Sequence, residues 1–99
     1  MMDGKIVKTA SGFSSYEIFN AEQNHIFTFA DVLTKRFSFH MDSAPICGLD
    51  GVYWDASKWN VKLTVGWDIW SGAFISANCP KGSEYVKEIA EYLDGLPDS

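Results

Sequence analysis

Residues 58–68 alternate between polar and apolar side chains, and this alternation constrains the fold more than any other feature of the chain. The apolar positions are Trp59, Val61, Leu63, Val65 and Trp67, with Asn, Lys and Thr between most of them. Because successive side chains of a β-strand point to opposite faces of a sheet, a period of two predicts a strand with one buried face. We therefore expect an antiparallel sheet with a Trp-rich buried face.

Two neighbouring strands are predicted, because their apolar residues can be placed on the same face as those of residues 58–68. Residues 51–54 form one, joined by a tight loop at 55–58. Residues 73–79 form the other, after a loop at 68–72. The register that keeps every apolar residue on one face pairs Trp54 with Trp59, Val52 with Val61, Ala73 with Trp67, Ile75 with Val65, Ala77 with Leu63 and Cys79 with Val61. Residues 51–79 are therefore predicted to form a three-stranded meander.

The C-terminal segment carries the clearest helix signal, because apolar residues recur in it at helical spacing. Ser83 stands where an N-cap is expected. Gly95 occupies the position of a left-handed cap, and Pro97 prevents continuation. We predict a helix at about 83–94 that folds over the Trp-rich face and leaves an acidic outer side formed by Glu84, Glu88, Glu91 and Asp94.

The N-terminal half gives weaker signals. Thr28 and Asp31 have the spacing of a capping box, and apolar residues follow at helical intervals, which predicts a helix at about 28–38. Residues 5–9 favour a short strand, whereas 13–19 fits a strand or a helix equally well.

Length and composition agree with one folded unit. The chain has 99 residues, of which 46% are hydrophobic and 21% charged, a balance that is typical of globular domains and sufficient for one core. We therefore predict a single α+β domain over residues 1–99. Its antiparallel sheet combines an N-terminal strand or strands with the meander, and it packs against the two helices.

Charge excludes some classes of partner. The net charge is −5, and no cluster of Lys and Arg could neutralise a phosphate backbone, so we expect no nucleic-acid partner. No apolar run has the length of a signal peptide or a membrane span, so we expect no membrane association and a reduced, cytoplasmic location.

Cys47 and Cys79 lack the spacing of a zinc or redox motif. Whether one disulfide joins them is not decided by the sequence.

The loop between the last two predicted strands is the leading candidate for a binding site. Ile69 and Trp70 fall at its tip, with Asp68 beside them, and a loop tip rarely buries such apolar side chains by itself. Either the loop tucks against the domain, or it presents an apolar anchor to a partner, as protein interfaces commonly do.

The opposite face of the meander combines aromatic and polar side chains. Its aromatic members are Tyr53 and Phe74, and its polar members are Asn60, Lys62, Thr64, Ser76 and Asn78. This composition fits a recognition surface, or a face covered by the N-terminal half of the chain or by another subunit. Coverage is the favoured interpretation, because a small domain usually wraps its sheet on at least one side.

A catalytic or metal site finds little support in the sequence. His40, Asp42 and Cys47 precede the meander and supply the residue types of a nucleophilic site, but no glycine-framed turn surrounds Cys47. His25 or Asp50 could join His40 and Asp42 at a divalent ion, yet their spacing matches no closed site. We expect no catalytic residue, no metal and no cofactor.

No motif is specific enough to identify a family. At the level of architecture alone, a short acidic domain with a meander and flanking helices resembles bacterial immunity or antitoxin-type proteins, and small orphan accessory proteins. We expect a non-enzymatic protein that binds a protein partner, or its own copy as a homodimer or larger homo-oligomer, through the apolar loop and the acidic helix side. The alternatives are a binder of a small apolar or aromatic ligand, with a pocket between sheet and helices beside Ala73 and Ala77, and a small enzyme that uses His40, Asp42 and Cys47.

Overall fold

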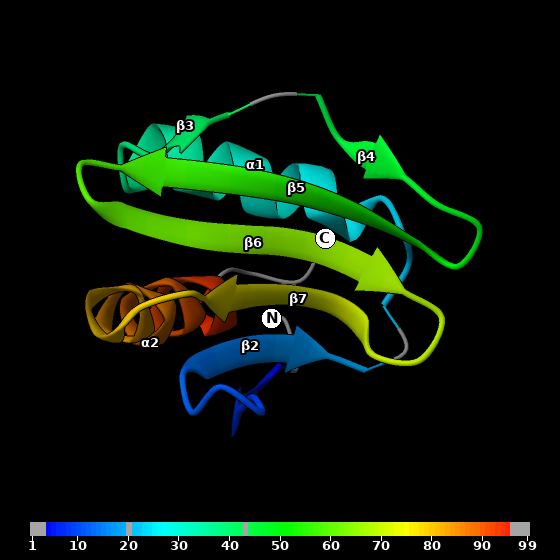
Figure 1. Ribbon diagram of the computed structural model, residues 1–99, viewed down its shortest axis with the longest axis horizontal. Coiled ribbons are helices and arrows are strands. Elements are labelled where there is room, and N and C mark those ends of the chain that lie inside the picture. Colours follow the sequence, from blue (N-terminus) through cyan, green and yellow to red (C-terminus); the bar gives the residue numbers. More distant parts are fainter. Residues whose placement is uncertain (1–3, 20, 43, 96–99) are drawn as a thin grey trace.

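The computed structural model describes residues 4–19, 21–42 and 44–95. Within these ranges the chain forms seven strands and two helices, arranged as one sheet with both helices behind it (Figure 1). The elements in chain order are β1 (Lys5–Lys8), β2 (Ser14–Ile18), α1 (His25–Arg36), β3 (His40–Met41), β4 (Ile46–Cys47), β5 (Gly51–Lys58), β6 (Val61–Asp68), β7 (Gly72–Ala77) and α2 (Pro80–Asp94). The predicted α+β class is confirmed.

The sheet is antiparallel, in the order β1-β2-β7-β6-β5-β3, and β4 pairs with β5. The predicted meander is present as β5, β6 and β7. Residues 14–18, within the segment that the sequence left open, form strand β2 between β1 and β7. The predicted register between β6 and β7 is confirmed in the pairs Trp67 with Ala73, Val65 with Ile75 and Leu63 with Ala77.

The predicted register between β5 and β6 is wrong. Strand β5 continues past Trp54 to Lys58 and pairs along the whole of β6. The longer pairing satisfies the backbone N–H and C=O groups of residues 55–58, which the predicted loop would have left without ladder partners. In the observed register Trp54 lies opposite Val65, and Val52 lies opposite Trp67.

Trp59 consequently lies in a turn and not in a strand. Trp59 and Asn60 form the two-residue connection from β5 to β6, and Trp59 has a φ of 55°, in the left-handed region that favours glycine. Its side chain is 84% exposed, so its predicted place on the buried face is wrong. Trp54 and Trp67 remain on that face and pack partly buried against the core.

Helix α1 begins three residues earlier than predicted, at His25. Thr28 and Asp31 lie inside the helix, so they form no capping box, and the preceding Asn24 makes no side-chain capping bond. The helix ends at Arg36, two residues earlier than predicted, and Ser38, with a φ of 60°, turns the chain away from the helical path. Of the apolar residues that follow Thr28 at helical spacing, Phe29, Val32 and Leu33 are buried, and Phe37, the C-cap, is partly buried.

Helix α2 begins at Pro80, in the first helical turn where proline is favoured. Cys79 is the N-cap, and its Sγ accepts a hydrogen bond from the backbone N–H of Gly82 at 3.3 Å. Ser83, the predicted N-cap, lies within the first turn, where its hydroxyl accepts from the N–H of Ser14 at 2.9 Å. Cys79 therefore caps a helix and does not extend β7, contrary to the prediction.

The end of α2 also differs in detail. Gly95 caps it with a φ of −86°, so the predicted left-handed cap is wrong, and Pro97 lies outside the described residues. On the outer side Glu84, Glu88 and Glu91 are exposed. Asp94 instead accepts a hydrogen bond from the hydroxyl of the buried Tyr16 at 2.7 Å. Neither α1 nor α2 has the length and apolar character that a membrane-spanning helix requires.

Both helices cover the same face of the sheet. Tyr16 of β2 demonstrates this, because its ring packs edge-on against Phe29 of α1 while its hydroxyl reaches Asp94 of α2. The core between the layers is formed by Tyr16, Ala56, Leu63, Val65, Ile75, Phe29, Leu33, Val86, Ile89 and Leu93 together with their neighbours. No described segment covers the other face, which we call the open face (Figure 1). The predicted coverage by the N-terminal half is therefore wrong, since β1 and β2 extend the sheet sideways.

Candidate binding surface

Three connections meet at one end of the sheet, on the right in Figure 1. They are the chain after β2, the loop between β4 and β5, and the loop between β6 and β7. The N–H of Ile69 donates to the carbonyl of Asp50 at 3.1 Å, and a Cβ on Gly72 would lie 3.2 Å from the Cα of Phe19. We call the surface that these connections form the loop end.

Large apolar side chains stand exposed on the loop end. The exposed fraction is 71% for Phe19, 59% for Ile69 and 66% for Trp70, and Leu49 is fully exposed. Exposed apolar residues scattered singly are normal on a protein surface, whereas neighbouring ones mark sites of interaction. The loop of Ile69 and Trp70 does not tuck against the domain. That it anchors a partner stays a prediction.

Asp68 holds the turn that presents Trp70. Its Oδ1 accepts hydrogen bonds from the backbone N–H groups of Trp70 at 3.0 Å and of Ser71 at 2.6 Å. Such side-chain to backbone bonds stabilise the turn in place of main-chain partners. Asp68 therefore stabilises the turn that carries Trp70. Its Oδ1 already accepts two hydrogen bonds within the turn.

The loop end is acidic. Among the described residues, its charged side chains are those of Glu17, Glu22, Asp50, Asp68 and Lys5, the last opposite Glu17 in the ladder between β1 and β2. These comprise four carboxylates and one ammonium group. The acidic groups that surround the apolar side chains come from these connections and from β2, and the predicted acidic side of α2 lies on the helix layer instead.

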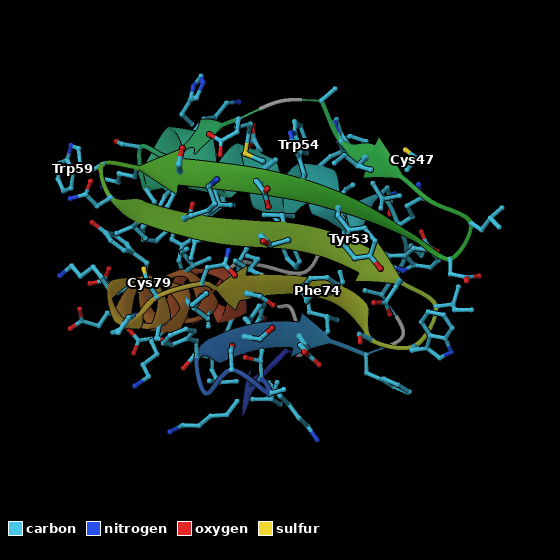
Figure 2. The ribbon with its side chains drawn as sticks, viewed as in Figure 1. Cys47, Tyr53, Trp54, Trp59, Phe74 and Cys79 are labelled. Carbon is cyan, nitrogen blue, oxygen red and sulfur yellow. The ribbon has the colours of Figure 1, made fainter. Side chains whose placement is uncertain are left out.

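Tyr53 and Phe74 lie together on the open face (Figure 2). Both are cross-strand partners of Gly66, one on each side, and their ring centroids are 6.2 Å apart. A Cβ built on Gly51 would lie 2.9 Å from the Tyr53 hydroxyl, so Tyr53 leans toward the loop end. The two aromatic residues therefore continue the loop end onto the open face.

The structure does not bring His40, Asp42 and Cys47 together. His40 lies opposite Ser57, and Cys47 lies opposite Val52, which separates the two positions by roughly 17 Å along β5 at the usual strand rise. Asp42 accepts a hydrogen bond from the Ser57 hydroxyl. A nucleophile, a base and an orienting group within hydrogen-bond reach are therefore not assembled from these three residues.

In the part of the chain that the structure describes, no three His, Cys, Asp or Glu side chains converge as a metal ion would require. Cys47 and Cys79 are both free thiols.

A cavity of about 310 Å³ opens where β1 and β2 meet the loop end. Its lining comprises Lys5, Val7, Glu17, Phe19 and Ser71. The space beside Ala77, where the sequence placed a ligand pocket, is occupied by α2: a Cβ on Gly82 would lie 3.2 Å from that of Ala77.

Sequence reasoning found Ile69 and Trp70 but missed Phe19 and Leu49. Phe19 ended a segment that fitted either a strand or a helix, and Leu49 stood in a long connection without a pattern. In the sequence, Phe19 and Leu49 were marked only as apolar residues beside a predicted turn. The meeting of three distant connections depends on strand order, which local patterns do not specify.

The chain was compared with protein families, with curated proteins and with solved structures, and none of the three comparisons gives a match.

Proposed function

We propose that the chain is a non-enzymatic binding protein that engages a protein partner through the loop end. One observation carries this proposal: Phe19, Leu49, Ile69 and Trp70 come from three separate connections and stand exposed on one surface. Fully burying one such side chain contributes about 1.5–3 kcal/mol. A partner that covered all four would gain about 6–12 kcal/mol, which is comparable to the cost of about 4–15 kcal/mol for the loss of translational and rotational freedom on association.

The acidic groups of the loop end indicate which charge the surface of the partner carries. Carboxylates around an apolar centre favour a surface that is itself apolar at its centre and basic at its rim. A role like that of an immunity or antitoxin protein, in which the loop end blocks one partner, is the specific form of this proposal. The electrostatic contribution acts mainly on the rate of encounter, and the apolar side chains supply the affinity.

Site-specific photo-cross-linking in the cells of origin tests the proposal. A photoreactive phenylalanine analogue replaces Trp70 in one variant, and Glu88 on the outer side of α2 in the matched control. We expect position 70 to cross-link a defined protein, and Ile69→Ser in the same chain to reduce that product. Equal products from both positions, or no product from position 70, would contradict the proposal.

A small ligand is the second candidate, because the cavity of about 310 Å³ combines apolar Val7 and Phe19 with the charged Lys5 and Glu17. That volume lies at the lower end of ligand sites. A ligand bound there should raise the melting temperature by mass action in the unmodified chain and not in a Val7→Arg variant. A library of small apolar and aromatic compounds that raises neither protein's melting temperature would remove this candidate.

A further inference from the structure

The end of the sheet opposite the loop end has the reverse charge. The hairpin of Trp59 lies there, with the end of α1 and the start of α2 beside it. Lys58 ties them together, because its Nζ donates to the carbonyl of Phe37 at 2.8 Å and lies 5.1 Å from the ring centroid of Tyr85. We call this surface the turn end. The cations of the hairpin and of these two helix ends are Lys35, Arg36, Lys58, Lys62 and Lys81.

Three carboxylates accompany these cations. Asp31 lies 2.9 Å from Lys35, Glu84 lies 3.3 Å from Lys81, and Asp42 lies 3.9 Å from Lys62. The lysines of these pairs are more than half exposed, so the pairs are weak and open to exchange with other carboxylates. Counting described residues alone, the turn end keeps an excess of positive charge, while the loop end has four carboxylates and one lysine.

Trp59 gives the turn end an apolar centre. It is 84% exposed, the highest value of any tryptophan in the chain, and it projects outward at the end of the hairpin (Figure 2). Its φ of 55° lies in a region that costs an L-residue about 1 kcal/mol or more. A glycine would fit this turn better. Local strain of this kind is a reason to look for a function of the side chain.

We propose that the loop end of one copy docks on the turn end of a second copy, head to tail. The two surfaces are complementary, because an apolar, acidic surface and an apolar, basic surface stand at opposite ends of the same molecule. Trp70 would lie against Trp59 and its neighbours, with Asp50 and Glu22 facing the exposed cations of α1 and the hairpin. This inference rests on the proposed function, because it uses the loop end as the docking surface, and it names the partner as the chain itself.

The size of the ends limits the area of this contact. The molecule measures 31 × 30 × 26 Å with the strands along the longest direction, so one end offers roughly 600 Å², below the ~800 Å² per partner of a standard interface. The association is therefore weak and transient. Because the two surfaces differ, a bound pair still has one free loop end and one free turn end, and the contact can continue into short chains or close into a ring.

Sedimentation velocity over a concentration series, with three variants, tests the proposal. The loop-end variant is Ile69→Ser with Trp70→Ser. The turn-end variant is Trp59→Gly, which relieves backbone strain and therefore keeps the fold. The control is Ile6→Ser, which removes an apolar side chain that is 42% exposed on β1. We expect the average sedimentation coefficient of the unmodified chain and of the control to rise with concentration. Each end variant alone should associate at least about tenfold more weakly.

Mixing the two end variants is the decisive measurement. The loop-end variant keeps a complete turn end, and the turn-end variant keeps a complete loop end. Their mixture should form a one-to-one dimer that grows no further, because both remaining ends are defective. The association of the unmodified chain should weaken between about 0.15 M and about 1 M salt, as the Debye length falls from roughly 8 to 3 Å.

Three outcomes would overturn the inference. The first is a monomeric unmodified chain over the whole series. The second is an association that only the loop-end variant removes, since that indicates a two-fold contact between loop ends. The third is a mixture of variants that stays monomeric while the unmodified chain associates. If position 70 cross-links a different protein in cells in any of these cases, the proposed function stands and only self-docking fails.

Discussion

The ring of Phe74 covers the backbone of Gly66, so closely that a Cβ on Gly66 would lie 2.5 Å from the ring Cζ. The two residues are cross-strand partners on β7 and β6, and Tyr53 stands on the other side of Gly66. A side chain at position 66 would occupy the space that the ring crosses to reach Tyr53. The glycine therefore allows the aromatic pair of the open face to form.

The first prediction concerns this contact. Gly66→Ala should destabilise the fold by about 1–3 kcal/mol, because the ring of Phe74 must move away. In a Phe74→Ala background the same change should be neutral or stabilising, because alanine is favoured over glycine in a strand by roughly 0.5–1 kcal/mol. Urea unfolding of the four proteins measures both values. Equal costs in the two backgrounds would show that the added methyl group does not meet the ring.

The second prediction concerns Lys58, which faces the helix layer although it is charged. Lys58→Met keeps the length of the side chain but removes the bond to the Phe37 carbonyl. The ammonium also lies over aromatic rings, with centroids at 6.0 Å for Phe39, 5.0 Å for Trp59 and 5.1 Å for Tyr85. We expect a loss of about 1–2 kcal/mol in the free energy of unfolding.

The matched control for this change is Lys62→Met. Lys62 is 56% exposed, and its nearest carboxylate, that of Asp42, is 3.9 Å away. Its replacement should change the free energy of unfolding by less than about 0.5 kcal/mol. If both lysine variants lose the same stability, the aromatic surroundings of Lys58 contribute nothing specific.

The third prediction separates the support of the loop end from its exposed tip. Asp68→Ala removes the acceptor of two backbone N–H groups, and should cost about 1 kcal/mol in the free energy of unfolding. Asp68→Asn keeps an acceptor oxygen and should cost less. Ile69→Ser, in the same turn, should stay within about 0.5 kcal/mol of the unmodified chain. Chemical denaturation of the three variants checks this order, and a larger loss for Ile69→Ser than for Asp68→Ala would reverse it.

The fourth prediction concerns the strained turn. Trp59→Gly should stabilise the fold by about 0.5 kcal/mol or more, because relief of the positive φ outweighs the lost contact with Lys58 and the larger entropy of the unfolded chain. Asn60→Gly is the control, since Asn60 does not share the positive φ, and it should destabilise. Thermal melts of both variants give the two signs. A destabilising Trp59→Gly would mean that the indole contributes more to the fold than the strain costs.

The sequence predicted the strand register correctly where apolar and polar residues alternated along both paired strands. The register of β6 and β7 followed from apolar residues alternating on both strands. The register of β5 failed because Lys58 occupies a position that faces the helices. A lysine buries its methylene stem among aromatic rings while its ammonium finds a partner, and a division into polar and apolar residues places it on the wrong face. The prediction therefore ended β5 at Trp54, four residues before its observed end, and placed Trp59 in the following strand.

The candidate site was predictable only in its local part. Ile69 and Trp70 were identified because they stood at the tip of a predicted hairpin. Phe19 joined them through strand order: β2 lies on the far side of β7, which brings the end of β2 beside the loop of Trp70. Leu49 joined them because β5 begins opposite the end of β6. Local patterns do not contain that pairing. The turn end was missed for the same reason, because its cations come from both helices and from the hairpin.

The pairing of β2 with β7 also determines when the chain can fold. Ser15 meets Ser76 across 61 positions of sequence, and Tyr16 meets Asp94 across 78. Contacts this distant form late, because loop closure must precede them. On the ribosome the hairpin of β1 and β2 emerges first and has no neighbour on its second edge until β7 has been made. The apolar side of α1 likewise lacks most of its sheet during that interval, and exposed apolar surface of this kind favours aggregation until β7 and α2 have formed.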